Sequence, residues 1–293
     1  MGNDNVGKGL IADTSNYGVD VSGISVIEKA QTASYTAIHD NSGDLALAVA
    51  DMNIFTKIDE QYLSRYHHDL ISSKIIVIDG NISYKALACI TSLESNTDRK
   101  DSSRVVIFEP TSDHKCLLPF TQKPILLNRI DVIKPNLSEL RLMFNACFAH
   151  EDIPEYQRNY CKHQQLYSSD SINDVGFMAS ILLNAMEYNN SDDKCKHVLV
   201  SLGKRGILWC TRSMAIKEIK HYIDGRYNYA IIPSLPIQIL GNTNGAGDNF
   251  LGGLIAYIIN NNKNDNILDN INISSIQAGL LAAKEKLLLN NNI

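Results

Sequence analysis

One segment near the C-terminal end combines small residues with an acidic side chain just before an apolar helical stretch. It reads NTNGAGDNFLGG at 242–253. Gly245, Ala246 and Gly247 have little or no side chain, so their backbone N–H groups can approach a ligand closely. At a helix start, unsatisfied N–H groups and the helix dipole favour an anion. The alternative is structural, with a tight glycine turn and Asp248 as the helix cap.

A second polar pattern follows a short apolar strand and reads KPNLSE at 134–139. Pro135 ends the strand, Asn136 can cap the next helix, and Glu139 lies on the same helix face. A carboxamide and a carboxylate at a strand end suit a hydrated Mg²⁺ with phosphates, because Mg²⁺ keeps most of its waters. The same two side chains could instead form only a capping box. Both interpretations stay open.

A third pattern, SLGKRG at 201–206, ends one strand and turns into another. Gly203 and Gly206 shape the turn, whose backbone could form a wall for a nucleotide phosphate or ribose, with Lys204 nearby. The alternative is a β-turn that merely contains glycine. By contrast, GNDNVGKG at 2–9 is not a phosphate-binding loop of the Walker type, because position 9 lacks the hydroxyl that reaches Mg²⁺. We interpret it as the start of a helix.

The elements that must position these patterns alternate between strands and helices. Such alternation is typical of a parallel sheet with helices on both faces. The predicted buried strands are 74–79, 104–108, 131–133 and 197–202, and the predicted helices are near 83–95, 137–148 and 172–189. Residues 31–39 and 44–50 flank a turn signal and predict a hairpin. No linker divides the chain, so we expect one domain over 1–293 that contains a small β region at about 25–55.

The order of the three patterns, each at a strand end, resembles the ribokinase-like (PfkB) family of sugar and nucleoside kinases. The family signature D-T-x-G-A-G-D-x-F-x-x-G matches residues 242–253 except at the first position. The resemblance covers nearly the whole chain. It implies a ribokinase-like α/β fold in three layers, α/β/α, with a mostly parallel central sheet and a small β lid.

The resemblance also implies ATP and Mg²⁺ as cofactors and a division of roles. Asp248 would take the proton from the acceptor hydroxyl, and the amides of Gly245, Ala246 and Gly247 would form the anion hole. Glu139 would reach the metal through water. The implied contacts to the nucleotide and its metal are Asn136, Glu139, Ser201, Gly203, Lys204, Gly206 and Thr243.

Residues 31–53 resemble the lid of the pseudouridine kinases, a subgroup of this family. They contain a T-x-x-Y strand, a D-N-x-G turn and a closing D-M-N, and the segments 79–83 and 108–115 also resemble that subgroup. The likeness implies phosphorylation of pseudouridine to pseudouridine 5′-phosphate. The implied substrate and lid residues are Thr32, Ser34, Tyr35, Asp51 and Asn53. A kinase for another sugar or nucleoside and a non-catalytic nucleotide-binding protein are the alternatives.

Two departures from the family pattern affect the expected cofactors and the expected sugar-binding segment. Asn242 replaces an Asp that in many members helps to hold a monovalent cation, so the expectation of K⁺ is weakened. MGND at 1–4 resembles the (I/V)-G-x-D that follows the family's first strand and its G-G-x-x-x-N sugar-binding segment. We therefore expect an N-terminally truncated form of the fold without these elements. Because lid strands pair between subunits in some members, a homodimer through residues 31–50 is a further expectation.

The resemblance implies a small-molecule nucleoside or sugar as the partner, and composition argues against two other classes of partner. The formal net charge is −5 and no Lys/Arg run is present, so no nucleic acid is expected. No apolar run approaches the ~18 residues of a membrane span, so no membrane is expected. The six Cys are scattered without a C-x-x-C pattern, which favours reduced thiols and a cytoplasmic location.

Overall fold

The structure is a computed structural model. It describes residues 1–39, 45–93, 104–149, 170–188, 194–212, 220–222, 227–238, 243–261 and 267–290. The chain forms two compact units, one of residues 1–70 with 81–90 and one of residues 71–80 with 91–293. None of the described helices is long and apolar enough to cross a membrane. The single domain expected over 1–293 stays a prediction.

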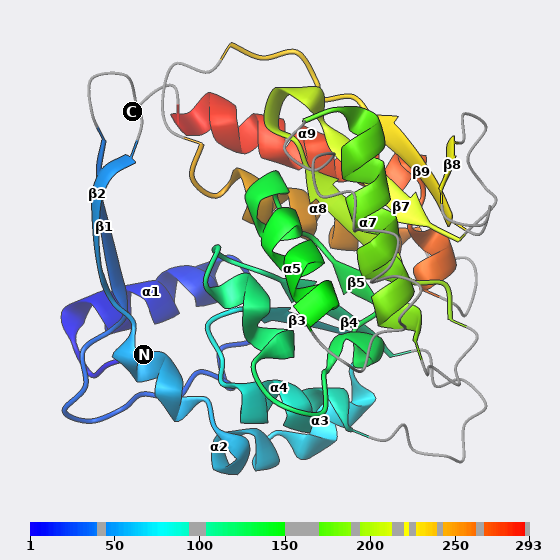
Figure 1. The fold of residues 1–293 in the computed structure, drawn as a ribbon. Coiled ribbons are helices and arrows are strands. Elements are labelled where there is room, and N and C mark those ends of the chain that lie inside the picture. The colour runs from blue at the N-terminus through cyan, green and yellow to red at the C-terminus, as the bar shows by residue number, and fades with distance from the viewer. Residues whose placement is uncertain are drawn as a thin grey trace. The chain divides into compact units, whose positions relative to one another are not determined.

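The first unit combines short helices with a hairpin (Figure 1). Its elements are α1 (Asn5–Asn16), β1 (Ser34–His39), β2 (Leu45–Asp51), η1 (Asn53–Lys57), α2 (Glu60–Ser64), α3 (His67–Ser72), which runs into the second unit, and α4 (Tyr84–Thr91). The predicted hairpin is confirmed, since β1 and β2 pair antiparallel with Ser34 opposite Asp51. The predicted helix start is confirmed as well, with Asp4 as the N-cap of α1.

The second unit is built on a seven-stranded sheet of order β3-β4-β5-β6-β7-β9-β8. The strands are β3 (Ile75–Asp79), β4 (Val105–Glu109), β5 (Val132–Ile133), β6 (His197–Ser201), β7 (Ile207–Thr211), β8 (Lys220–Tyr222) and β9 (Tyr227–Ile232). Strands β3 to β6 are parallel, which confirms the parallel body read from the apolar runs, and β7, β9 and β8 extend it antiparallel.

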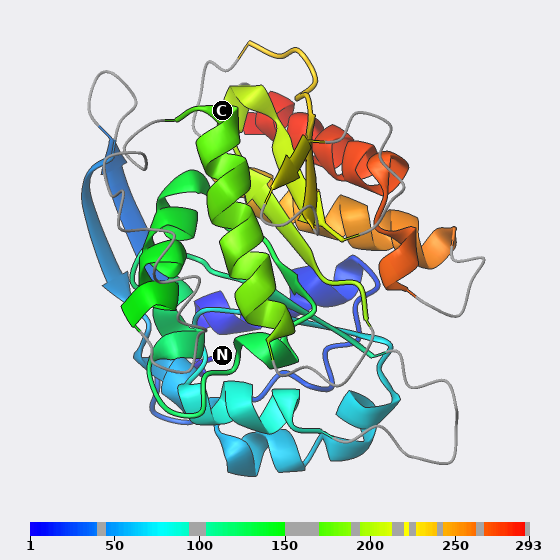
Figure 2. The ribbon, with the colours of Figure 1, turned by 45° about the vertical axis from the view of Figure 1, so that its right-hand side comes forward.

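Helices cover both faces of this sheet (Figures 1 and 2). They are α5 (Leu137–Ala149), α7 (Ile172–Glu187), α8 (Ala246–Asn260) and α9 (Ile273–Asn290), with the short 3₁₀ helices η2 (Lys115–Phe120), η3 (Leu127–Arg129), η5 (Gly203–Arg205) and η6 (Leu268–Asn270). Helices α5 and α7 lie on one face, and α8 and α9 lie on the other. The three-layer α/β/α class is therefore confirmed.

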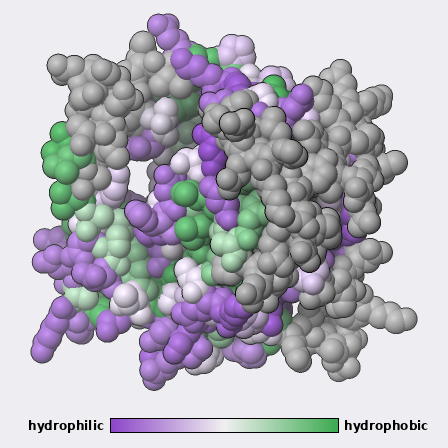
Figure 3. All heavy atoms as spheres, in the orientation of Figure 1, coloured by the Kyte–Doolittle hydropathy of each residue, from purple (hydrophilic) through white to green (hydrophobic). Residues whose placement is uncertain are grey.

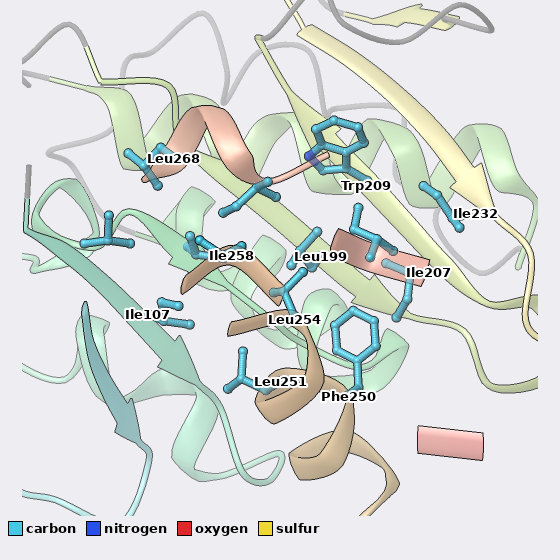
Figure 4. Close-up of a cluster of buried hydrophobic side chains, with 14 of the residues drawn as sticks. Ile107, Leu199, Ile207, Trp209, Ile232, Phe250, Leu251, Leu254, Ile258 and Leu268 are labelled. Carbon is cyan, nitrogen blue, oxygen red and sulfur yellow. The ribbon is translucent and has the colours of Figure 1, made fainter. Parts of the chain in front are cut away.

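The core between the sheet and α8 is apolar and closely packed (Figure 4). Because side chains alternate along a strand, Ile107, Leu199 and Trp209 all point to this face. They meet Leu254 and Ile258 of α8, and all five are at most 1% exposed. Each such aliphatic side chain contributes about 1.5–3 kcal/mol when fully buried. This contact fixes the position of α8 over the middle of the sheet.

One polar pair lies within this apolar layer. The indole Nε1 of Trp209 donates a hydrogen bond of 3.0 Å to Nδ1 of His197. Burial lowers the pKa of His197 to about 3, so the imidazole is neutral and its Nδ1 can accept. The pair satisfies the indole N–H without a charge in the core.

Helices α8 and α9 approach each other through small residues. A methyl group added at Gly253 would lie 2.6 Å from Cβ of Ala282 and 2.9 Å from the carbonyl oxygen of Ala278. One added at Gly279 would lie 2.7 Å from the carbonyl oxygen of Phe250. Real Cβ atoms do not come so close, so glycine is required at both positions for this crossing.

We expect Gly253→Ala to lower the free energy of unfolding by about 1–3 kcal/mol, because the methyl group overpacks the α8–α9 contact. The matched control is Gly252→Ala in the same helix, where an added methyl group meets nothing within 4 Å. There the better helix propensity of alanine should stabilise the protein by up to about 1 kcal/mol. Urea unfolding of the three proteins measures both effects. Equal stability of the two variants would contradict this account of the crossing.

Candidate functional site

The carboxyl ends of the parallel strands gather the polar patterns at one edge of the sheet, as is usual for ligand sites in such folds. Glu109 ends β4, Lys134 follows β5, and Ser201 ends β6. The backbone N–H of Ser201 donates to the carbonyl of Pro135 at 2.8 Å, and Asn136 forms a bridge with Ser201. The second and third sequence patterns are therefore neighbours.

The start of α8 has the geometry of an anion-binding turn. Gly245 is the N-cap and has a left-handed backbone with φ of 77°, which disfavours any side chain there. Ala246 and Gly247 are the first helical residues, and Asp248 is the third and is exposed. The interpretation of Asp248 as the cap residue is therefore wrong. Within the described parts of the chain, no group donates a hydrogen bond to its carboxylate.

Helix α9 supports this turn from behind. The side-chain amide of Asn290 donates to the carbonyl of Asn244 at 3.1 Å. A methyl group on Gly245 would lie 3.2 Å from Cε of Lys286. Asn249 closes the turn from within α8, since its amide donates to the carbonyl of Gly245 at 2.8 Å. The turn is held in place from both sides, so its amides have a fixed direction.

Asn136 and Glu139 form the capping box that the sequence allowed. The N–H of Glu139 donates to Oδ1 of Asn136 at 2.9 Å, and the N–H of Asn136 donates to Oε2 of Glu139 at 2.8 Å. The box fixes the start of α5 and directs the Glu139 carboxylate to the sheet edge. Burial raises the pKa of this carboxyl, and the bond from Asn136 opposes the shift. Asn136 and Glu139 therefore have a structural role as helix caps, and their role at a metal stays a prediction.

An ion pair that the sequence patterns did not single out lies beside this box. Lys134 is 3% exposed, and its Nζ lies 2.8 Å from Oε2 of Glu109. A methyl group on Gly247 would lie 3.3 Å from the same ammonium, which places Lys134 directly against the first turn of α8. Burial raises the pKa of Glu109, and the ammonium of Lys134 opposes that shift.

The charges around this point are unbalanced. Asp248 raises the pKa of Glu109, and both Glu109 and Asp113 raise that of Glu139, so four carboxyl groups act on one another. Among the described residues, Lys134 is the one cation that acts on both buried glutamates. Such an excess of oxygen ligands beside a positive helix end suits Mg²⁺ with phosphate. The sequence feature that could have indicated Glu109 is a carboxylate at the end of an apolar strand.

The loop after β4 is conformationally strained. Thr111 has φ of 69°, which is unusual for a β-branched residue. Its Oγ1 accepts a hydrogen bond of 2.9 Å from the N–H of Gly80, so the turns after β3 and β4 are joined. Ser138 of α5 donates to Asp113 of the same loop at 3.0 Å. Strain of this kind persists where the surrounding structure enforces it, often at functional sites.

The turn between β6 and β7 requires its glycines for structural reasons. Gly203 and Gly206 have φ of 57° and 97°, and a methyl group on Gly206 would lie 2.1 Å from the carbonyl oxygen of Ile232. Lys204 is exposed, and its carbonyl accepts from Ser234 Oγ at 2.6 Å. Thr243, just before the α8 turn, is exposed too. The nucleotide role of these residues stays a prediction.

The predicted substrate and lid residues belong to the first unit. Thr32 is buried, and its Oγ1 donates to Asp4 at 2.8 Å and accepts from the N–H of Gly2 at 3.0 Å. It therefore holds residues 1–4 to the strand that follows. The other four, Ser34, Tyr35, Asp51 and Asn53, are exposed on or next to the hairpin.

Two further expectations concern cations. Asn242, on which the K⁺ expectation depends, lies outside the described residues. In the described ranges, no group of three or more His, Cys, Asp or Glu side chains is arranged to hold a metal ion by itself.

Known proteins share this sequence pattern. The pattern of the pfkB family carbohydrate kinases matches residues 1–166 and 181–269. The chain is 28% identical over 205 residues to the pseudouridine kinase of Escherichia coli, covering 66% of this chain and 62% of that protein. It is 30% identical over 254 residues to a pseudouridine-metabolizing bifunctional protein of Schizosaccharomyces pombe, covering 80% of this chain and 32% of that one. The chain thus spans less than two thirds of the length of each.

Solved structures share the fold at low identity. Adenosine kinase of Anopheles gambiae superposes with a TM-score of 0.63 at 17% identity and covers 98% of this chain and 71% of its own. Ribokinase of Thermotoga maritima superposes with a TM-score of 0.57 at 16% identity and covers 99% and 80%. The family pattern matches well over half of the chain, and the fold agrees with it. The chain belongs to the pfkB family of carbohydrate kinases.

Proposed function

We propose that this protein transfers a phosphoryl group from ATP to a hydroxyl group of a nucleoside or sugar, with pseudouridine as the favoured acceptor. One observation carries the proposal. The first turn of α8 presents the amides of Gly245 to Gly247 and the exposed Asp248 at the same edge as Lys134 and Glu139. In the proposed reaction, this arrangement would supply an anion hole, a base and a place for a hydrated metal.

Asp248 is the proposed general base. Its carboxylate is exposed in the first turn of α8, so an acceptor hydroxyl can reach it. The proton passes from the hydroxyl to the carboxylate while the oxygen bonds to the transferred phosphorus and the bond to the leaving ADP oxygen breaks. The amides of the turn stabilise charge on the equatorial oxygens, since positioning and electrostatics supply most of the catalysis in this reaction.

Glu139 and Asn136 are the proposed residues for Mg²⁺, held through water, and Ser201, Gly203, Lys204, Gly206 and Thr243 are the proposed nucleotide contacts. When bound, the metal would neutralise charge on the phosphates. The excess of carboxylates around Lys134 supports this assignment. The proposal includes no monovalent cation, because Asn242 lacks the charge that the family signature has there.

Pseudouridine is favoured as acceptor because two relatives that act on it, by their names, align over 66% and 80% of this chain. The hairpin patterns of the sequence support the same choice, and Thr32, Ser34, Tyr35, Asp51 and Asn53 are the proposed substrate and lid residues on that resemblance alone. The proposal places the enzyme in the cytoplasm, with neither nucleic acid nor membrane as a partner.

An acceptor panel tests the reaction and the substrate together. ADP formation is measured with MgATP and pseudouridine, uridine, ribose or adenosine. We expect the largest kcat/KM with pseudouridine and a 5′-phosphate as product. A faster reaction with another acceptor would support the kinase activity but contradict pseudouridine as the favoured acceptor. ATP binding without turnover on any acceptor would favour a non-catalytic nucleotide-binding protein.

The variant Asp248→Asn tests the base. It keeps the shape of the side chain and removes its basic charge, so we expect kcat to fall by about 10²–10⁴-fold. ATP affinity should stay within about twofold of the wild type, because ground-state binding is separate from proton transfer. Asp269→Asn, the same change at an exposed residue of η6, is the control and should leave turnover intact. Normal turnover in Asp248→Asn would contradict the assignment of Asp248 as the general base.

We also propose a homodimer through the hairpin. Ile38 lies opposite Leu47 and Thr36 lies opposite Val49, so these side chains share one face. Ile38, Leu47 and Val49 are 54%, 55% and 63% exposed, and hydrophobic residues, in green, lie on part of the hairpin in Figure 3. An isolated two-stranded sheet is only marginally stable, so a second hairpin is a suitable partner.

Light scattering after gel filtration tests the dimer. We expect twice the chain mass for the wild type and the single-chain mass for Val49→Lys, because a buried lysine would oppose the contact. Leu289→Lys changes an equally exposed residue of α9 and should remain a dimer. A wild-type monomer, or a dimer that Val49→Lys does not affect, would rule out this interface.

A further inference from the structure

Lys134 occupies an unusual place for a lysine. Its side chain is 4% exposed, its ammonium lies 2.8 Å from the Glu109 carboxylate, and a methyl group added at Gly247 would lie 3.3 Å from the same ammonium. The lysine comes from the segment after β5, the glutamate from the end of β4 and the glycine from the first turn of α8. Three elements far apart in the sequence therefore meet at one positive charge.

The position is electrostatically unfavourable by itself. A helix N-terminus carries about half a positive charge, so cations are stabilising at the other end of a helix. Burial adds a desolvation cost for the ammonium, and its ion pair with Glu109 offsets only part of that cost. A third group with negative charge, placed at the amides of the turn, would be attracted by both the helix end and the ammonium.

We propose that Lys134 is a positioning residue for phosphoryl transfer. Held by Glu109 next to Gly247, its ammonium adds positive charge close to the amides of Gly245 to Gly247 and strengthens their hold on the terminal phosphate of ATP. The inference rests on the proposed function and deepens it, because it gives the anion hole a cation from the sheet. It also explains glycine at position 247, where a methyl group would press on the ammonium.

A merely structural ion pair makes a different prediction. Removing one partner of a buried pair leaves an uncompensated charge and destabilises the fold, whereas removing both is often close to neutral. If Lys134 only balances Glu109, the double variant Lys134→Met/Glu109→Gln should regain both stability and function. If Lys134 acts on the phosphate, stability returns and function does not.

The experiment compares the wild type, Lys134→Met and the double variant. Thermal melting reports stability, and calorimetry reports the affinities for ADP and for a non-hydrolysable ATP analogue. In the double variant we expect most of the lost melting temperature to return and ADP affinity to change by less than about twofold. Affinity for the analogue should fall about tenfold, and kcat with the best acceptor about 100-fold, as for loss of one oxyanion donor.

Two further variants keep the test decisive. Lys196→Met is the matched control. Lys196, just before β6, is also buried, but its ammonium donates to the carbonyls of Asn128 and Ile130. It should not change the ratio of analogue to ADP affinity. Glu109→Gln keeps the ammonium and should retain or increase the preference for the analogue. If the double variant does not fold, Glu109→Gln provides the test in its place. Loss of the preference for the analogue over ADP in Glu109→Gln would overturn the inference.

The remaining outcomes separate this inference from the proposed function. Turnover and analogue affinity that recover with stability in the double variant would overturn the role of Lys134 and leave the kinase intact. If the wild type binds both nucleotides and phosphorylates no acceptor, the proposed function fails, and the affinity ratio still decides on Lys134. If the wild type binds neither nucleotide, the proposed function and the role of Lys134 are both contradicted.

Discussion

The packing of α8 between the sheet and α9 is the constraint on which the candidate site depends. Leu254 and Ile258 fix the helix over the parallel strands, and the absence of side chains at Gly253 and Gly279 lets α9 approach it. The helix can then start only where Gly245 turns the chain, at the carboxyl edge of the strands. An amide turn displaced from that edge would have no strand-end residues beside it. The geometry of the candidate site therefore depends on helix packing as much as on the residues of the turn.

Much of this arrangement could be predicted from the sequence because it follows local rules. The apolar runs predicted β3 to β6, and the spacing of Asn136 and Glu139 allowed a capping box as one of two interpretations. Strands β8 and β9 were not predicted, since KHY is too short to show a period and YNYAII alternates weakly. The Lys134–Glu109 pair could not be predicted either. Its partners lie on neighbouring strands, and their meeting depends on strand order, which no local pattern encodes.

The site also shows how one edge serves opposite charges. The start of α8 and Lys134 attract anions, whereas Glu109, Asp113, Glu139 and Asp248 repel them and attract cations. A bare phosphate would be held at the helix and repelled by the carboxylates. A phosphate accompanied by a divalent cation satisfies both groups at once. This balance agrees with the family to which the chain belongs.

The capping box bears on how such a site would decay in evolution. Asn136 and Glu139 start α5 whether or not any chemistry takes place, so selection for folding alone would preserve them. Asp248 contributes less to folding, since Gly245 caps the helix and the exposed carboxylate adds only a favourable charge in the first turn. In descendants that lost catalysis, the box should outlast the aspartate. An aspartate at this position is therefore a better indicator of catalysis than an intact capping box.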